Sequence, residues 1–384
     1  MASYFLALIS LSDMAQVARA GNDDTNENRL PSIASTMNSN CEPLVSVVTP
    51  VYNGAMYLRE CIESVLAQTY QNWEYIIVNN RSTDDTLPIV EEYAKRSMAI
   101  RVYSNDKFLD VIANHNRGLR LISEVSKYCK VVSADDWLFP ECIARMVAVP
   151  EANPSVGIVG SYQLSGGSNG WHVQWDELPY PSTIIPGRAI CRHQLLGAPY
   201  MFANPTSLLY RSDLVRGHDG FYPNSRPGAD ASACYKYLES SDFGFVHQVL
   251  SYERVHENAI NTTSRSLNSF LADRLHDLTE YGPIYLTEDE LVARTKDILS
   301  SYYQFLANNF FVGRDKVFWQ YHKRNLAGSG HPLSRLRLVS AVCVKLLDLA
   351  LNPKQTVEKV VRRATIRRPL HDIPPRSPCQ LISR

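Results

Sequence analysis

Short apolar runs alternate with helix-like patterns over the first 160 residues. Residues 45–50 are mostly apolar, and the apolar positions over 58–66 repeat at the spacing of one helix face. Further strands are predicted over 75–78, 100–103, 129–133 and 156–160, with helices opening at Asp84 or Asp85 and running over 111–126. This alternation predicts an α/β fold in which helices cover both faces of a mostly parallel sheet.

Polar residues follow three of these predicted strands at the point where each strand ends. They are Thr49 and Pro50 after the first strand, residues 79–84 after the second, and residues 133–136 after the fourth. Parallel strands bring their carboxyl ends to one edge of a sheet, which is where such folds bind ligands. We therefore expect the three segments to share one rim.

Asp135 and Asp136 are adjacent carboxylates at the end of an apolar run. Hard cations such as Mg²⁺ and Mn²⁺ prefer carboxylate oxygens and often bridge them to phosphates. The pair therefore predicts half of a diphosphate-binding cation site. The alternative is that Asp136 caps a helix beginning near Pro140.

Three motifs occur in order along this region. They are Val-Val-Thr-Pro-Val-Tyr-Asn at 47–53, Ser-Thr-Asp-Asp-Thr at 82–86 and Ser-Ala-Asp-Asp at 133–136. Together they resemble the nucleotide-binding half of the family 2 inverting glycosyltransferases, which have the Rossmann-like GT-A fold. The resemblance runs from about Leu44 to Thr263 and predicts a domain over 44–265. The sequence has no glycine-rich dinucleotide or P-loop motif, so a dehydrogenase or a P-loop enzyme fits poorly.

The resemblance implies a set of residues that contact a nucleotide-sugar donor. They are Thr49, Pro50, Tyr52, Asn79, Arg81, Asn116, Ser133, Ala134 and Asp135. Asn79 stands where the family has an aspartate that accepts a hydrogen bond from a pyrimidine ring, and an amide oxygen can still accept one. A simple turn at Asn79 and Asn80 is the alternative.

The family's metal motif is Asp-x-Asp, and Ser133 replaces its first aspartate in this chain. The resemblance therefore assigns a Mg²⁺ or Mn²⁺ ion to Asp135, with Asp136 in a supporting or water-mediated contact. It also assigns His256, in a Tyr-x-Arg-x-His segment, to the diphosphate or the cation. An ordinary polar role for His256 stays open.

The acceptor side is implied by a second segment of the resemblance. Asp230 has the position of the family's general base, although Ala229 replaces the glutamate that usually precedes it. An inverting transfer needs such a carboxylate to remove the proton from the acceptor hydroxyl. Asp230 as a helix N-cap or first-turn acid is the alternative, and the two roles are compatible. Trp171 and Trp175 are candidate stacking surfaces for an acceptor sugar, with core packing as the alternative.

These implications predict a metal-dependent inverting transfer of a sugar from a nucleotide-diphosphate donor to a hydroxyl acceptor. The expected acceptor is a saccharide or lipid-linked saccharide of a bacterial surface polysaccharide or exopolysaccharide. The competing hypothesis is a catalytically impaired relative that binds a sugar nucleotide or a partner. That hypothesis arises because Asn79, Ser133 and Ala229 stand where the family has acids.

Charge is unevenly distributed although 39 Lys and Arg balance 39 Asp and Glu. From Arg314 onward there are fifteen basic and four acidic residues. Residues 266–384 are predicted to be a basic helical region, and two interpretations stay open. The region either lies against an anionic membrane surface or packs on the catalytic domain with a solvated basic face. No nucleic-acid recognition motif accompanies the charge, so nucleic acid is not an expected partner.

The chain ends carry no predicted fold. Residues 1–43, which include a polar run over 22–28, are expected to be disordered, as is the tail after about 368. The apolar run over 5–11 lacks the preceding basic residues of a signal peptide. Eight cysteines without paired spacing fit a reducing compartment and argue against a zinc site. We expect a cytoplasmic protein, either free or peripheral on the inner face of the cytoplasmic membrane.

Overall fold

The computed structural model describes residues 42–351 except 168–169, 176–177, 179–181, 199, 203, 218–219 and 257–266. The tail predicted after about 368, and all but the last two residues of the extension predicted over 1–43, lie outside the described residues.

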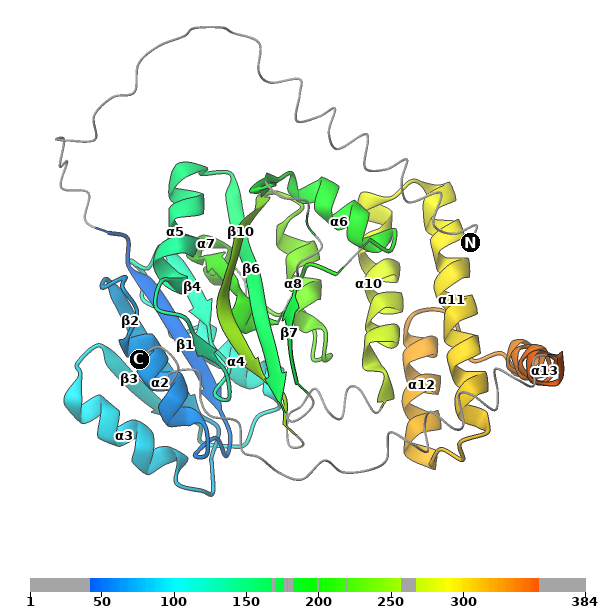
Figure 1. Ribbon diagram of the computed structural model, residues 1–384, viewed down its shortest axis with the longest axis horizontal. Coiled ribbons are helices and arrows are strands. Elements are labelled where there is room, and N and C mark those ends of the chain that lie inside the picture. Colours follow the sequence, from blue (N-terminus) through cyan, green and yellow to red (C-terminus); the bar gives the residue numbers. More distant parts are fainter. Residues whose placement is uncertain are drawn as a thin grey trace, which may run out of the picture. The chain divides into compact units, whose positions relative to one another are not determined.

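Strands and helices alternate through the first half of the chain, as the apolar pattern predicts (Figure 1). The strands are β1 (Val45–Val51), β2 (Trp73–Asn79), β3 (Ile100–Ser104), β4 (Tyr128–Val131), β5 (Trp137–Leu138), β6 (Val156–Gly167), β7 (Gly170–Gln174), β8 (Ile184–Ile185), β9 (Leu208–Arg211) and β10 (Asp242–Arg254). The helices of this part are α2 (Leu58–Leu66), α3 (Thr86–Arg96), α4 (Val111–Leu119), α5 (Cys142–Ala152), α6 (Gly187–Leu195), the 3₁₀ turn η1 (Pro205–Ser207), α7 (Ser212–Arg216) and α8 (Ala229–Tyr237).

One sheet in the order β3-β2-β1-β4-β9-β6-β10-β5 forms the centre of the fold. Strands β1 to β4 are parallel, which confirms the predicted βα alternation. Strand β9 runs antiparallel to both of its neighbours, β4 and β6. The α/β fold class is therefore correct, and the half of the sheet beyond β4 is mixed rather than mostly parallel.

Alternate residues of the central strands face two separate cores. Val47 and Tyr75 belong to one core, which α2, α3 and α5 cover, whereas Val48 and Ile76 face the other, which α4, α6 and α8 cover. Because both faces are buried, each strand reads as a nearly continuous apolar run. This is why the strands are visible in the sequence.

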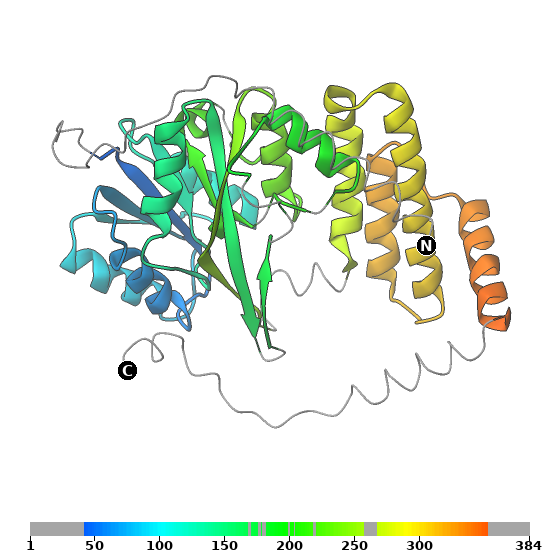
Figure 2. The ribbon, with the colours of Figure 1, turned by 45° about the horizontal axis from the view of Figure 1, so that its top comes forward.

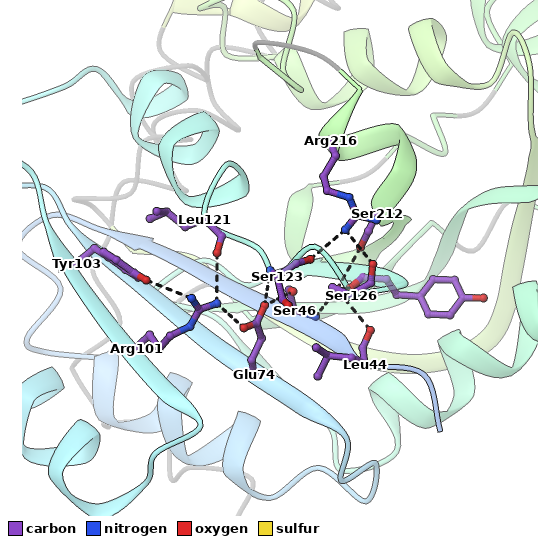
Figure 3. Close-up of polar contacts among 11 residues, drawn as sticks. Leu44, Ser46, Glu74, Arg101, Tyr103, Leu121, Ser123, Ser126, Ser212 and Arg216 are labelled. Atoms are coloured by element: carbon purple, nitrogen blue, oxygen red, sulfur yellow. Dashed lines mark hydrogen bonds and ion pairs between the residues drawn. The ribbon is translucent and has the colours of Figure 1, made fainter. Parts of the chain in front are cut away.

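A polar network fastens the sheet at the edge where β1 and β2 begin (Figure 3). The carboxylate of Glu74 on β2 accepts hydrogen bonds from the Ser46 hydroxyl, the Ser123 amide (2.7 Å) and Arg101. Arg216 donates to the Ser123 carbonyl at 3.0 Å. These bonds use the backbone just after α4, which ends at Leu119 instead of continuing to 126 as predicted.

Within the described part of the chain, four helices follow the sheet domain (Figure 2). They are α10 (Ser269–Tyr285), α11 (Glu288–Phe310), α12 (Lys316–Gly328) and α13 (Arg335–Leu351). Helix α10 packs on α6 and α8, and α11 packs between α10 and α13. Among the described residues, none of the helices combines the length and apolar character needed to cross a bilayer.

Candidate active site

The carboxyl ends of β1, β2, β4 and β10 meet at one edge of the sheet, opposite the Glu74 network. The parallel pairing of β1 with β2 and β4 fixes the first three ends. Strand β10 runs in the same direction as β4, because β9 and β6 reverse the direction twice between them. Helix α8 lies just before β10 in the chain and begins at the same edge. We call this edge the rim.

Loops after β1 and β2 are tied together at the rim. The Asn53 amide N–H donates to Ser82 Oγ at 2.9 Å, and Asn53 Oδ1 accepts from the Thr83 amide at 2.8 Å. The Ala55 amide donates to Asp84 Oδ2 at 3.0 Å. Asn53 has a left-handed backbone with φ of +49°, which asparagine tolerates better than most residues. The motifs at 47–53 and 82–86 therefore form one bonded structure.

Tyr52 is the most open of the predicted donor contacts on the β1 side. Half of its surface is exposed, and its ring packs edge-on against the exposed Phe108 with centroids 4.9 Å apart. Phe108 follows β3, so the two rings flank the end of β2, where Asn79 and Arg81 lie. Sequence reasoning did not select Phe108, because a lone aromatic in a loop carries no signal by itself.

Asn79 is buried and its side chain has local partners. Its Oδ1 accepts from the Ser82 amide at 3.0 Å, and its Nδ2 donates to Ser104 Oγ at 3.3 Å. The turn alternative for Asn79 and Asn80 therefore describes this geometry. Arg81 is exposed, has φ of +59°, and donates to the Asp106 carbonyl at 2.9 Å.

Three other predicted donor contacts have roles inside the protein. The Thr49 side chain is fully buried, with its hydroxyl 2.9 Å from the Tyr75 hydroxyl, and Pro50 is buried beside it. Asn116 on α4 accepts a hydrogen bond from the Tyr222 amide at 2.9 Å and donates one to the Tyr222 carbonyl at 3.1 Å. These two hydrogen bonds connect α4 to the loop that leads into α8.

Asp136 is a buried brace between distant segments. Its Oδ2 accepts from the Thr206 hydroxyl at 2.6 Å, and its Oδ1 accepts from the Arg254 amide at 3.1 Å. Burial and the neighbouring Asp135 charge raise the pKa of Asp136 well above its usual value. Helix α5 begins at Cys142 with Glu141 as its N-cap, so Asp136 is not a helix cap.

Thr206 and Lys130 complete this brace, and neither was selected from the sequence. The Thr206 hydroxyl accepts from the Ser133 amide at 3.1 Å and lies 3.2 Å from the Ser133 hydroxyl. Beneath it, the fully buried ammonium of Lys130 donates to the Thr206 and Leu208 carbonyls at 2.6 and 3.0 Å. A lysine inside an apolar strand was the available signal, since buried lysines need such partners.

Asp135 points away from the brace toward His256. Its Oδ2 lies 3.0 Å from His256 Nε2, and about a third of its side chain is exposed. Arg254 donates through Nε to the Asp135 carbonyl at 3.1 Å, and its guanidinium lies over the Tyr57 ring at 4.4 Å from the centroid. The same arginine forms an ion pair with Glu60. Carboxylate, imidazole and guanidinium thus gather at the rim, and Ala134 lies between Ser133 and Asp135.

Asp135 and His256 are the side chains at the rim that could hold a Mg²⁺ or Mn²⁺ ion. Their 3.0 Å contact is a hydrogen bond in this structure, and a carboxylate oxygen is the ligand type that these ions prefer. Among the described residues, no group of three or more His, Cys, Asp or Glu side chains has the arrangement of a metal site. An ion bound to Asp135 would therefore need further ligands, which a diphosphate could supply.

Asp230 lies in the first turn of α8, in agreement with the first-turn alternative. Its Oδ1 accepts from the Ala231 amide at 2.9 Å. Burial raises the pKa of Asp230 to about 7, despite a smaller opposing effect of this hydrogen bond. Such a carboxyl group exchanges a proton near neutral pH, which suits a general base.

The two candidate acceptor tryptophans differ in exposure. Trp171 on β7 is 45% exposed and packs on Tyr252 with ring centroids 5.2 Å apart. Trp175 has φ of +67° and packs against the core near Tyr200, with centroids 6.0 Å apart. Trp171 has an open ring face and can stack on a sugar, whereas Trp175 matches the core-packing alternative.

Known proteins are similar in sequence to part of this chain. Residues 46–214 match the family model described as glycosyl transferase family 2. This segment, less than half of the 384 residues, is similar to that family. The matched segment includes Asp135 and Asp136, whereas Asp230 and His256 lie beyond it.

Two curated relatives carry glycosyltransferase names. An uncharacterized glycosyltransferase of Haemophilus influenzae is 41% identical over 123 residues, 32% of this chain and 37% of that protein. An uncharacterized glycosyltransferase of Rickettsia prowazekii is 29% identical over 275 residues, 70% of this chain and 82% of that protein. The second match extends well beyond the segment of the family model.

A solved structure shares the fold. It is S. aureus TarS, residues 1–349, in complex with UDP-GlcNAc. The TM-score is 0.59 at 16% identity, with 81% of this chain and 92% of the TarS chain covered. At this identity the likeness concerns the arrangement of strands and helices, which agrees with the GT-A fold expected from the motifs.

Proposed function

We propose that the protein transfers a sugar, with inversion, from a nucleotide-diphosphate donor to a hydroxyl of a saccharide or lipid-linked acceptor. The observation that carries this proposal is the pair of Asp135 and His256 at the rim where α8, with Asp230, also begins. TarS, which shares the fold, was solved with UDP-GlcNAc. We assign the product to a bacterial surface polysaccharide or exopolysaccharide.

In the proposed reaction the residues of the chain bind, orient and move one proton. Tyr52 and Phe108 offer ring faces to the base, and Arg254 offsets phosphate charge beside Asp135. Asp230 accepts the proton of the acceptor hydroxyl as that oxygen bonds to the anomeric carbon. The bond from this carbon to the diphosphate breaks on the opposite side, and its electron pair leaves with the diphosphate.

Asp135 and His256 would hold the Mg²⁺ or Mn²⁺ ion, with Asp136 supporting Asp135 from behind. When bound, the ion would neutralise negative charge on the departing diphosphate. The partial exposure of the Asp135 carboxylate at the rim, beside His256, supports this assignment.

The lipid-linked acceptor and the membrane contact are supported by helix α13. Its exposed apolar side chains include Leu336, Val339 and Leu347, and the exposed Arg335 and Arg337 lie on the same helix. An apolar helix face with basic flanks binds anionic lipid surfaces. We infer that α13 holds the enzyme at the inner face of the cytoplasmic membrane.

Transfer assays over a panel of nucleotide sugars, with and without Mn²⁺, test the reaction. Asp230→Asn is expected to lower kcat by about 10²- to 10⁴-fold, the contribution of a general base, with donor binding retained. Asp135→Ala should weaken Mn²⁺-dependent donor binding. Glu91→Gln, an exposed acid on α3, is the matched control and should leave both quantities unchanged.

Two results would contradict the proposal. Full kcat in Asp230→Asn would remove the assigned base. Saturable donor binding without turnover for any acceptor would instead support the impaired relative, in which Asn79, Ser133 and Ala229 replace the acids of an active site.

A further inference from the structure

Helix α10 packs along the first turn of α8, which carries Asp230 (Figure 1). Two carboxylates of α10, four residues apart, contact α8 and the loop before it. Asp277 accepts a hydrogen bond from the Ser232 hydroxyl at 2.7 Å. Asp273 forms an ion pair with Arg226 at 3.0 Å. Both carboxylates are buried, so they are not surface charges that happen to lie nearby.

The contact of Asp273 with the start of α8 is close. Gly228 is the N-cap of α8, and a Cβ at this glycine would lie 3.1 Å from Asp273 Cβ and 3.3 Å from its Oδ2. Among the described residues, Oδ2 of Asp273 has no hydrogen-bond partner of good geometry. Burial raises the pKa of Asp273 to about 6, and the nearby Arg226 and the Gly228 backbone oppose this rise. The first turn of α8 thus rests directly on the Asp273 side chain.

A cavity borders the start of α8. Its volume is about 130 Å³, and its walls come from α6, α8, α10 and α11, with Gly228, Tyr235, Asp273 and Asp277 among the lining residues. A space of this size is not filled by packed side chains. The position of the α8 start therefore depends more on the two polar contacts than it would in a close-packed core.

We propose that Asp273 and Asp277 are positioning residues that hold the first turn of α8, and with it the carboxylate of Asp230, toward the acceptor. This inference rests on the proposed role of Asp230. It makes the helical C-terminal region part of the acceptor half of the enzyme, although α10 lies outside the segment that matches the family model.

The charges around Asp230 provide a test of this positioning role. Among the described residues, the titratable groups that interact with Asp230 are Tyr200, Tyr210, Tyr222, Cys234, Asp273 and Asp277. The tyrosines and the cysteine have pKa values raised by burial and stay neutral. The negative charge of Asp273 raises the pKa of Asp230, after the larger effect of burial. Removing that charge should lower the pKa of Asp230.

The test is the pH dependence of kcat/KM in the full-length enzyme and in Asp273→Asn. Asp230 must be ionised to act as a base, so activity falls as the pH drops through its pKa. In Asp273→Asn the acid limb should move to lower pH by about half a unit or more, as expected on loss of a nearby like charge. The KM for the donor should stay unchanged. Glu280→Gln, an exposed acid on the same helix, is the matched control.

A milder variant covers the case in which Asp273→Asn does not fold. Ser232→Ala removes only the hydroxyl that Asp277 holds, and it should lower kcat several-fold at an unchanged donor KM and a nearly unchanged Tm. Equal loss of kcat at every pH in Asp273→Asn, or an unchanged kcat in a folded Ser232→Ala, would overturn the inference. If Asp230→Asn keeps full activity, Asp230 is not the general base of the proposed reaction. That result is distinct from a failure of Asp273 and Asp277 as positioning residues.

Discussion

Asp135 and Asp136 are adjacent in the chain yet have opposite surroundings. Asp135 is partly exposed and faces His256, whereas both oxygens of Asp136 hold hydrogen bonds from other segments. The sequence predicts the pair and its position at a strand end. The family resemblance also assigns the cation to Asp135 and a supporting contact to Asp136. The sequence does not reveal the partners that hold Asp136, because Thr206 and Arg254 lie 70 and 118 residues away.

Lys130→Met tests the support beneath this pair. The variant removes the ammonium from under Thr206 and leaves two buried carbonyls without that donor, which should lower the free energy of unfolding by about 2–4 kcal/mol. Donor affinity should fall as well, since Thr206 orients Ser133 and Asp136. Denaturant unfolding measures the first effect and donor titration the second. Lys95→Met, exposed on α3, is the control, and equal stability of the two variants would contradict the role.

Strands and helices with a clear pattern of apolar residues could be predicted from the sequence. Strands and contacts that depend on partners far along the chain could not. Strands β1 to β4 appear as apolar runs because both faces of this half of the sheet are buried. Strand β9 has only four residues, and its antiparallel place between β4 and β6 depends on partners far along the chain. The contact of α10 with α8 was hidden for the same reason, since neither Asp273 nor Asp277 belongs to a motif.

The packing of α11 against α12 predicts a pH effect on stability. His322 is fully buried, its Nδ1 lies 2.8 Å from the Tyr302 hydroxyl, and burial lowers its pKa to about 4. The unfolded chain therefore takes up this proton at a higher pH than the folded one. As a result, His322 contributes a loss of stability as the pH falls from about 6.5 toward about 4.

His322→Gln isolates this contribution. The difference in Tm between the wild type and the variant, measured from pH 7 to 4.5, should shrink as the pH falls, because only the wild type carries the histidine penalty. His331→Gln, on the loop before α13, is the control and should show no such trend. A constant difference between wild type and His322→Gln across this range would show that His322 is not kept neutral by the fold.

At the scale of the whole molecule, the sheet domain and the C-terminal helices have different surfaces. The rim carries the charged and aromatic residues of the proposed reaction, whereas α13 carries exposed apolar and basic side chains. The chain has no net formal charge, so the excess of basic residues from Arg314 onward is balanced by acids elsewhere. An anionic surface would therefore attract the segment from Arg314 onward more strongly than the rest of the chain.

Vesicle flotation tests this attraction. Replacing Leu336, Val339 and Leu347 together by glutamine should lower the fraction bound to anionic vesicles by about tenfold, because the apolar area that enters the interface is lost. Zwitterionic vesicles should bind the wild type weakly. Val125→Gln, which removes an exposed valine near the opposite edge of the sheet, is the control. Equal flotation of the triple variant and the wild type would exclude α13 as the contact.

The hydrogen bonds that Thr206 and Arg254 donate to Asp136, and that Ser232 donates to Asp277, have a consequence for folding during protein synthesis. A nascent chain leaves the ribosome from its N-terminus, so β1 to β4 emerge long before their stabilising partners exist. Until β10 has joined the sheet, Asp136 lacks the Arg254 amide, and until α10 has emerged, α8 lacks its support. Translation must therefore pass Tyr285, the last residue of α10, before the first turn of α8 has the support that the proposed reaction needs.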